Sequence, residues 1–330
     1  MVDDAQFGVR DRRGDWKPRE PIHYPPAPWH IRAFSKFLYG FPGYFLPWTT
    51  VYALVAIGLW FFLTPPLESM KTFQLDWMAF LLVRNFVLVA AVYGAWYWLL
   101  YIRKSQKNAF KLNGRWPERD NEAFVFKDQV KDNIFWALGS AVPFWTAWEC
   151  FAYWMFANHY VPFVEWASHP IYFVLIMALM PVFHDLHFFA IHRLLHWPPL
   201  YKYVHHIHHN NVSVNPWSGL AMHPIEHLLY FSGVLIHFVI PSHPLHALYH
   251  LTLAGLSPAR SHSGFERLVI GSRSFSLRSQ IHYLHHKFFE CNYSSGPVPV
   301  DKWTGTFHDG TAEAQEKMTK RFMAQAKGSD

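Results

Sequence analysis

The chain contains four long stretches in which nearly every position is apolar. They cover residues 45–64, 85–102, 134–157 and 171–183. The first two carry no charged side chain, the third contains only Glu149, and the fourth ends where His184 begins a histidine-rich part of the chain. Because a helix needs about 20 apolar residues to cross the hydrocarbon core of a bilayer, this pattern predicts four membrane-spanning helices.

Two further apolar stretches, residues 228–240 and 245–258, are shorter and contain histidines. Apolar segments of 10 to 14 residues are more typical of buried or half-inserted helices than of full spans. We therefore expect both stretches to lie among the other helices.

The segments that flank and connect these helices are alternately rich and poor in lysine and arginine. Residues 1–40 contain seven of them and residues 103–131 contain eight, whereas residues 65–83 contain one and residues 158–170 none. Cytoplasmic connections carry the excess of positive charge. We therefore expect the N-terminal segment, the 103–131 loop and everything after about residue 184 to face the cytoplasm, with no cleaved signal peptide, since the first forty residues contain no apolar run.

This division predicts four regions. They are a cytoplasmic N-terminal segment (1–40), a membrane-spanning region (41–170) with a cytoplasmic loop (103–132), a histidine-rich region (171–311) and a polar C-terminal tail (312–330).

Composition agrees with a membrane protein. Hydrophobic residues make up 51% of the chain and charged residues 16%, against about a quarter charged in soluble domains. The two cysteines, Cys150 and Cys291, are too far apart to form a thiolate metal motif, and two cysteines cannot build a disulfide framework. The net charge of +6 is typical of connections that face anionic lipid, and no motif indicates binding of nucleic acid.

Histidine is concentrated in the second half of the chain. Of 23 histidines, all but His23, His30, His159 and His169 lie between residues 184 and 308. Three groups have helical spacing, in which residues three or four apart share one face. They are His192 and His196 in HRLLH; His205, His208 and His209 in HHIHH; and His282, His285 and His286 in HYLHH.

These eight imidazoles are twice the number that a tetrahedral zinc site needs, so the spacing predicts two metal ions. Neutral imidazole suits iron, zinc, copper or nickel, and an all-nitrogen site without thiolate fits a pair of irons that handle oxygen. An isolated histidine is more often a hydrogen-bonded core residue. We expect that role for His184, His237, His243, His246 and His250.

In these motifs the sequence resembles the fatty acid hydroxylase and sterol desaturase superfamily of membrane di-iron enzymes. The family order is H-x-x-x-H, then H-x-x-H-H twice, as found here. HPIEH at 223–227, HSGFE at 262–266 and the segment 292–311 also look like the family's connecting segments. The resemblance covers roughly residues 180–311, and the first 170 residues share only a helical, membrane-embedded character.

The resemblance implies an all-α integral membrane protein with about four transmembrane helices and a cytoplasmic, histidine-rich helical cap that holds a dinuclear metal site. The implied ligands are His192, His196, His205, His208, His209, His262, His282, His285 and His286. Three further histidines, His187, His223 and His227, are either ligands or supporting groups.

Four other residues have implied supporting roles. Glu226 and Glu266 would orient ligand imidazoles through their outer N–H groups, although a surface salt bridge is the alternative for Glu266. Asn292 and Trp303 would hold the C-terminal segment against the site.

The resemblance also implies two iron ions, O2 as co-substrate, and hydroxylation or desaturation of a lipid such as a sterol, a fatty acyl chain or a lipid head group. The chain has neither the H-P-G-G heme motif nor a G-x-G-x-x-G fingerprint, so we expect a separate electron donor of the ferredoxin, rubredoxin or cytochrome b5 type, with its reductase. The expected location is a bacterial inner membrane, with the metal site on the cytoplasmic face.

Two alternatives remain open from the sequence. The same histidines would serve a non-catalytic membrane metal transporter or sensor. They would also serve a zinc-dependent hydrolase.

Overall fold

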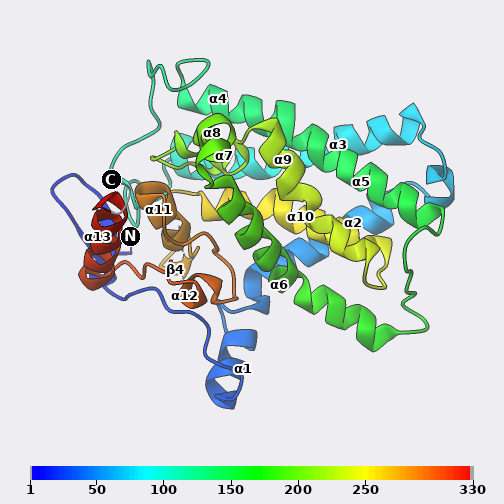
Figure 1. The fold of residues 1–330 in the computed structure, drawn as a ribbon, viewed down its shortest axis with the longest axis horizontal. Coiled ribbons are helices and arrows are strands. Elements are labelled where there is room, and N and C mark those ends of the chain that lie inside the picture. The colour runs from blue at the N-terminus through cyan, green and yellow to red at the C-terminus, as the bar shows by residue number, and fades with distance from the viewer. Residues whose placement is uncertain (1, 328–330) are drawn as a thin grey trace.

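The computed structural model describes residues 2–327, which are mostly helical (Figure 1). The α-helices are α1 (Ile31–Tyr39), α2 (Thr50–Leu63), α3 (Leu75–Tyr97), α4 (Gln129–Trp136), α5 (Val142–Ala157), α6 (Pro170–Leu195), α7 (Pro198–Leu200), α8 (His206–His209), α9 (Pro224–Phe231), α10 (Pro244–Ser261), α11 (Gln280–Phe288), α12 (Val300–Trp303) and α13 (Ala312–Lys327).

Short 3-10 or π-helical segments extend or connect several of these helices. They are η1 (Asp4–Gln6), η2 (Phe45–Thr49), η3 (Leu67–Met70), η4 (Trp98–Ile102), η5 (Ala137–Ala141), η6 (Tyr201–His205), η7 (Pro216–Leu220) and η8 (Ser232–Phe238). The strands form two antiparallel hairpins, β1 (Gly8–Arg10) with β2 (Trp16–Pro18) and β3 (Arg267–Ile270) with β4 (Arg273–Ser276).

Three of the described helical segments are long and apolar enough to cross a membrane: Phe45–Leu63, Leu75–Ile102 and Pro170–Leu195. The first matches the predicted span 45–64. The third predicted span, residues 134–157, is helical as α4, η5 and α5 but is not among these three. The structure thus supports a membrane protein with three such segments, where the sequence pattern predicted four.

The second segment begins ten residues before the predicted span 85–102. The predicted span begins directly after Arg84, because a charged side chain is unfavourable in hydrocarbon. In the structure Arg84 is buried and forms an ion pair with Glu149 of α5. Asn85 donates to the same carboxylate, with Nδ2 2.9 Å from Oε2, so α3 continues through a polar contact that joins it to α5.

The fourth predicted span, residues 171–183, is also too short. Helix α6 continues through His184 and Asp185 to Leu195. The Asp185 carboxylate is buried and accepts hydrogen bonds from Ser294 Oγ at 2.6 Å, Gly296 N at 3.0 Å and Val298 N at 3.0 Å. One helix therefore runs from the apolar part of the molecule to the first histidine motif.

Helix α10 is the centre of the bundle and packs against α2, α3, α5 and α6. Nearly all of its residues are buried, as expected for the stretch 245–258. A Cβ at Gly255 would lie 2.1 Å from the Trp145 ring, so this position permits the close approach of α5. The stretch 228–240 forms the end of α9 and the 3-10 segment η8, and it is not one continuous α-helix.

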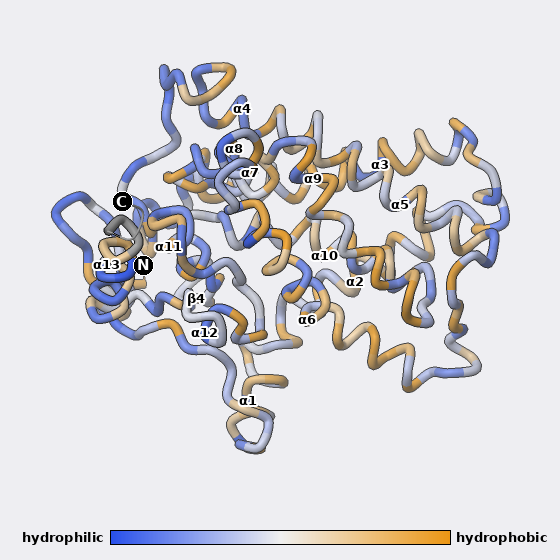
Figure 2. The backbone as a smooth tube through the Cα atoms, viewed as in Figure 1, coloured by the Kyte–Doolittle hydropathy of each residue, from blue (hydrophilic) through white to orange (hydrophobic). Residues whose placement is uncertain are grey.

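The polar segments gather at one end of the molecule (Figures 1 and 2). The N-terminal hairpin contacts the 103–131 loop, where Trp16 N donates to Lys111 O at 3.3 Å. It also contacts α11, where Lys287 Nζ lies 3.2 Å from Asp15 Oδ2. Figure 2 shows the hydrophobic residues concentrated in the long helices, away from both termini.

The two connections that are poor in positive charge also meet. Asn158 Nδ2 donates to Lys71 O at 3.1 Å, which joins the connections before α3 and α6. The structure therefore separates the positively charged connections from the others in the way that the charge pattern predicts. Which end faces the cytoplasm stays a prediction.

Candidate metal centre

The nine histidines that the sequence analysis named lie together, on four parts of the fold. Helix α6 and its C-cap carry His192 and His196, the η6–α8 segment carries the second motif, His262 caps α10, and α11 carries the third motif. The side chains form two groups. The first contains His192, His196, His205, His209 and His285, and the second contains His208, His262, His282 and His286.

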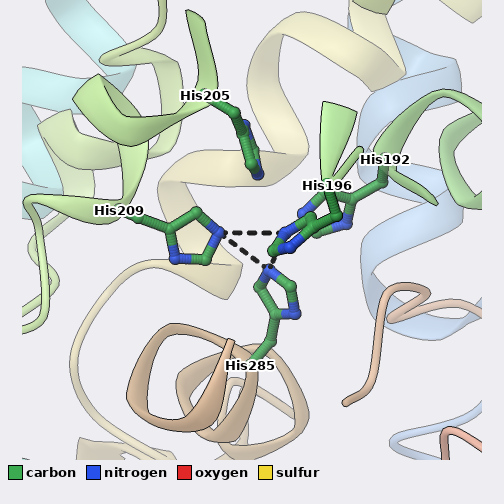
Figure 3. Close-up of side chains that lie close together, drawn as sticks. All are labelled: His192, His196, His205, His209 and His285. Carbon is green, nitrogen blue, oxygen red and sulfur yellow. Dashed lines mark hydrogen bonds between the residues drawn. The ribbon is translucent and has the colours of Figure 1, made fainter. Parts of the chain in front are cut away.

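In the first group the Nε2 atoms face one another (Figure 3). Those of His196, His209 and His285 are separated by 3.1 to 3.2 Å. The Nε2 atoms of His192 and His205 are buried, and no described residue forms a hydrogen bond with either of them. Five nitrogen atoms are therefore directed toward one small space.

The second group is arranged around His262. Its Nε2 atom lies 2.9 Å from that of His282, 3.2 Å from that of His286 and 3.4 Å from that of His208. The Nε2 atoms of His282 and His286 are 3.2 Å apart. All four imidazoles are buried.

These distances fit shared metal ions. Nitrogen ligands at roughly 2.0–2.1 Å from one ion would be separated by roughly 2.8–3.0 Å in octahedral and roughly 3.3–3.4 Å in tetrahedral geometry. Burial also lowers the pKa of His208 to about 4, so its imidazole is neutral at pH 7. Neutral imidazole is the form that binds metal, and the donor set fits one ion in each group.

The outer nitrogens of several ligands are held by backbone carbonyls. The Nδ1–H groups of His192 and His285 donate to Tyr293 O and Cys291 O, both at 2.7 Å. That of His262 lies 3.2 Å from Pro258 O. Because a carbonyl only accepts, these contacts place the proton on Nδ1 and leave Nε2 free to bind metal.

Glu226 contacts a histidine of the first group, in the position that the resemblance implied for it. Its Oε1 atom lies 2.8 Å from His205 Nδ1, and both side chains are buried. Glu266 does neither of the things expected of it. It accepts hydrogen bonds from Gln280 N at 2.8 Å and Ser276 Oγ at 2.9 Å, so it holds the N-terminus of α11 and contacts no ligand imidazole among the described residues.

The three histidines left open between ligand and support lie outside both groups. His187 Nε2 is 3.1 Å from Ser232 Oγ, and His223 Nδ1 accepts from Ile225 N at the start of α9. The two ring nitrogens of His227 contact Ser140 Oγ at 2.9 Å and Leu220 O at 3.2 Å. None of these hydrogen bonds reaches a histidine of either group.

Most of the isolated histidines have the expected core contacts. His237 Nδ1 lies 2.9 Å from Ser242 Oγ, and His250 Nδ1 lies 3.3 Å from His237 Nε2. His246 Nε2 donates to Phe173 O at 3.1 Å, and His184 packs edge-on against the His250 ring. His243 is different, because it caps the N-terminus of α10 by accepting from Leu245 N at 3.1 Å.

Asn292 holds the C-terminal segment as expected. Its side chain donates to Ile281 O and His308 O and accepts from His308 N at 2.8 Å. The expectation for Trp303 is wrong, because its side chain is 68% exposed. The neighbouring Asp301 accepts hydrogen bonds from Tyr293 N and Ser294 N. The sequence pattern did not predict this role.

A cavity of about 150 Å³ lies beside both groups. Its lining includes five of the grouped histidines, His192, His205, His208, His262 and His282. Aromatic and aliphatic side chains from the segment before α2 and from α2, α6, α9 and α10 complete much of the wall, namely Phe37, Tyr44, Trp48, Tyr52, Phe188, Tyr230 and Leu253. An apolar part of a ligand therefore fits next to the imidazoles.

Comparison with known proteins supports the resemblance seen in the motifs. The family described as fatty acid hydroxylase matches residues 177–306. A delta(7)-sterol 5(6)-desaturase of Gibberella zeae is 30% identical over 46% of this chain and 49% of its own length. A delta(7)-sterol-C5(6)-desaturase of Nicotiana tabacum is 23% identical over 72% of this chain and 86% of its own.

Methylsterol monooxygenase 1 of Gallus gallus is 28% identical over 48% of this chain and 54% of its own length. The chain thus spans about half the length of the fungal and avian relatives. No solved structure matches. These relatives are eukaryotic and lend no support to the expected bacterial inner membrane.

Proposed function

The chain belongs, through residues 177–306, to the fatty acid hydroxylase and sterol desaturase superfamily, and we propose that it oxidises an unactivated C–H bond of a membrane lipid with O2 and two bound iron ions. The observation that carries this proposal is the pair of imidazole groups beside one partly apolar cavity. The product is a hydroxylated or a desaturated lipid. A sterol, a fatty acyl chain and a lipid head group are the candidate sites of reaction.

Iron held by the nine histidines would supply the reduction of O2 and the oxidation of the C–H bond. An all-nitrogen donor set without thiolate suits iron that handles oxygen. The chain's part is to hold the imidazoles in place, which the contacts of His192, His205 and His285 through Nδ1 accomplish.

Aromatic residues would exclude water and orient the substrate. Phe188 stacks on His192, with ring centroids 4.8 Å apart, and Tyr230 meets Phe188 edge-on at 5.8 Å. The Tyr230 hydroxyl donates to Ala254 O at 2.8 Å, so its ring is fixed. These rings line the cavity and would press a hydrocarbon segment toward the histidines.

The membrane would deliver the substrate. Two of the three apolar helical segments, Phe45–Leu63 and Pro170–Leu195, contribute residues to the cavity wall, so a lipid would reach the histidines sideways from the bilayer. We place both termini and the metal centre on the cytoplasmic side, because the positively charged connections lie at that end. A ferredoxin, rubredoxin or cytochrome b5, with its reductase, would supply electrons there.

The test combines metal analysis with turnover. Protein purified without oxygen should contain about two irons per chain and should consume O2 when given a membrane lipid extract and a reduced donor. Mass spectrometry of the lipids should then show a species with one more oxygen or two fewer hydrogens. The variant His205→Ala should lose iron and turnover, whereas His227→Gln, outside both groups, should keep its iron.

Other outcomes would favour the alternatives. Zinc without iron, together with lipid cleavage that needs no O2, would indicate a hydrolase. Metal uptake or release across vesicles without any lipid product would indicate a transporter.

A further inference from the structure

Two arginines line the same cavity, and the proposed oxidation does not use them. Arg260 lies near the C-terminus of α10, two residues before His262, and Arg278 follows strand β4. Two cations beside an apolar cavity are unfavourable unless something with negative charge joins them.

Arg278 is available to a ligand. Its side chain is exposed, but the space around it belongs to two cavities, the one beside the histidines and one beneath the N-terminal segment. No described residue accepts a hydrogen bond from its guanidinium.

Arg260 is oriented but only partly satisfied. One of its Nη groups donates to Leu277 O, and its guanidinium lies over the Trp48 ring, 5.6 Å from the centroid. Its Nε–H is buried and has no partner among the described residues. The side chain is therefore held in place while its buried Nε–H is still free to donate.

The nearby carboxylates do not neutralise this pair. Two carboxylates, Asp185 and Glu226, line the same cavity. Asp185 accepts three hydrogen bonds from the 294–298 segment, and Glu226 Oε1 contacts His205 Nδ1. Glu266 is engaged by Gln280 N and Ser276 Oγ. None of the three forms an ion pair with Arg260 or Arg278 among the described residues. The two guanidinium groups thus remain available for an anion that enters the cavity.

We propose that Arg260 and Arg278 bind a carboxylate or phosphate group of the lipid substrate and so position its reacting carbon at the histidines. Guanidinium groups recognise such oxyanions by charge-assisted, often bidentate hydrogen bonds. This inference rests on the proposed lipid oxidation and specifies its substrate class as anionic lipids, in place of neutral sterols.

The size of the cavity limits the distance between the anionic group of the lipid and the carbon that is oxidised. An engineered cavity of about 150 Å³ takes up benzene, so this one holds only a short part of a lipid. The oxidised carbon therefore lies within a few bonds of the anionic group. The rest of the hydrocarbon chain passes the aromatic residues Phe37 and Tyr44 toward the apolar helices.

Binding of defined probes tests the proposal. Full-length protein in phosphatidylcholine nanodiscs is given radiolabelled palmitate, hexadecyl phosphate or hexadecanol, and bound probe is measured by scintillation proximity. Wild type should bind at least one anionic probe about tenfold more tightly than hexadecanol. Arg260→Gln and Arg278→Gln should each remove about tenfold of that affinity, as expected for a lost charge-assisted hydrogen bond.

Three variants separate recognition from other effects. Arg278→Lys keeps the charge and should keep part of the preference for the anionic probe. Arg273→Gln replaces an exposed arginine on strand β4 and should leave the binding of all three probes unchanged. His205→Ala should bind the anionic probe while losing metal. Preference for palmitate alone would identify a carboxylate, and preference for hexadecyl phosphate alone a phosphate.

Equal affinity for all three probes, or equal losses for all three in Arg278→Gln, would overturn the proposal. O2-dependent oxidation of a neutral lipid that is insensitive to both arginine variants would refute it and leave the proposed function intact. Selective anion binding by protein that holds no iron and consumes no O2 would instead refute the proposed function alone.

Discussion

His208 and His209 are neighbours in the sequence, and their imidazoles belong to different groups. The Nε2 atom of His209 lies 3.1 Å from that of His285, whereas the Nε2 atom of His208 lies 3.4 Å from that of His262. Adjacent residues on a helix point about 100° apart, so one motif reaches two sites. On α11, His285 and His286 are divided between the groups in the same way.

This division predicts which metal each substitution removes. Alanine at His209 or His285 should empty the first site, and alanine at His208 or His286 should empty the second. Each single variant should therefore lose about one metal ion per chain, measured by inductively coupled plasma mass spectrometry on protein purified without oxygen. The double variant His208→Ala/His286→Ala should lose no more than either single one, while His208→Ala/His209→Ala should lose both ions. A double variant within one group that lost two ions would contradict the assignment.

Glu226 should set the affinity of the first site. Removing an outer hydrogen-bond partner of a metal-bound histidine lowers metal affinity about 10- to 100-fold, so Glu226→Ala should do this through His205. Glu226→Gln keeps an oxygen that accepts from His205 Nδ1 and should lose much less. Competition with a chelator measures both affinities. Unchanged affinity in Glu226→Ala would mean that the contact does not orient the ligand.

The sequence allowed the candidate ligands to be named, and the structure brings them together, but their division between two groups could not be foreseen. Spacing of three and four residues identified which imidazoles share a helix face, because that depends on helix geometry alone. Whether His208 meets His262 or His285 depends on how α8, α10 and α11 pack. That packing involves residues more than fifty positions apart.

The same limit explains the helix boundaries that were wrong. Arg84 directly precedes the predicted span 85–102, and Asp185 lies just beyond the predicted span 171–183, yet each lies inside its helix and has partners far away in the chain. Glu149 is 65 residues from Arg84, and Ser294 is 109 residues from Asp185. A local hydropathy pattern holds no information about such partners.

The Arg84–Glu149 pair leads to a prediction about stability. Both side chains are almost fully buried, and removing one partner of a buried ion pair costs about 3–5 kcal/mol because the other charge stays behind. Arg84→Met should therefore lower the free energy of unfolding strongly, and Arg84→Met/Glu149→Met should recover much of the loss. Unfolding by sodium dodecyl sulfate in mixed micelles measures this cycle.

The exposed pair Lys71–Glu68 is the matched control. Glu68→Gln should leave unfolding unchanged, since exposed ion pairs contribute little. If the double variant at Arg84 and Glu149 were as unstable as both single variants together, the two residues would not be coupled.

His243 should affect helix α10 and leave the metal centre unchanged. Because its side chain caps the N-terminus of α10, His243→Ala should cost about 1 kcal/mol of stability, while His243→Asn, which also caps well, should cost less. Both variants should keep the full metal content. Thermal unfolding and metal analysis of the same preparations separate these effects, and loss of metal in His243→Ala would show that the capping assignment is incomplete.

The last prediction concerns electrons. Hydroxylation of one C–H bond takes two electrons from the substrate, and so does desaturation, whereas reduction of O2 to the level of water consumes four. Two electrons must therefore come from elsewhere in every turnover. Cys150 and Cys291 are both buried and are too few for a four-cysteine iron-sulfur cluster, so we expect the electrons to come from a separate donor. The positively charged N-terminal segment and the 103–131 loop lie at one end of the molecule, near the metal centre, where an acidic ferredoxin would dock faster at low salt than at high salt.

Enzyme reduced once and then given O2 and lipid should turn over at most once, and product should accumulate only after a reduced donor is added. Mass spectrometry measures the product. Repeated turnover without any donor would contradict both this prediction and the oxygenase function on which it rests.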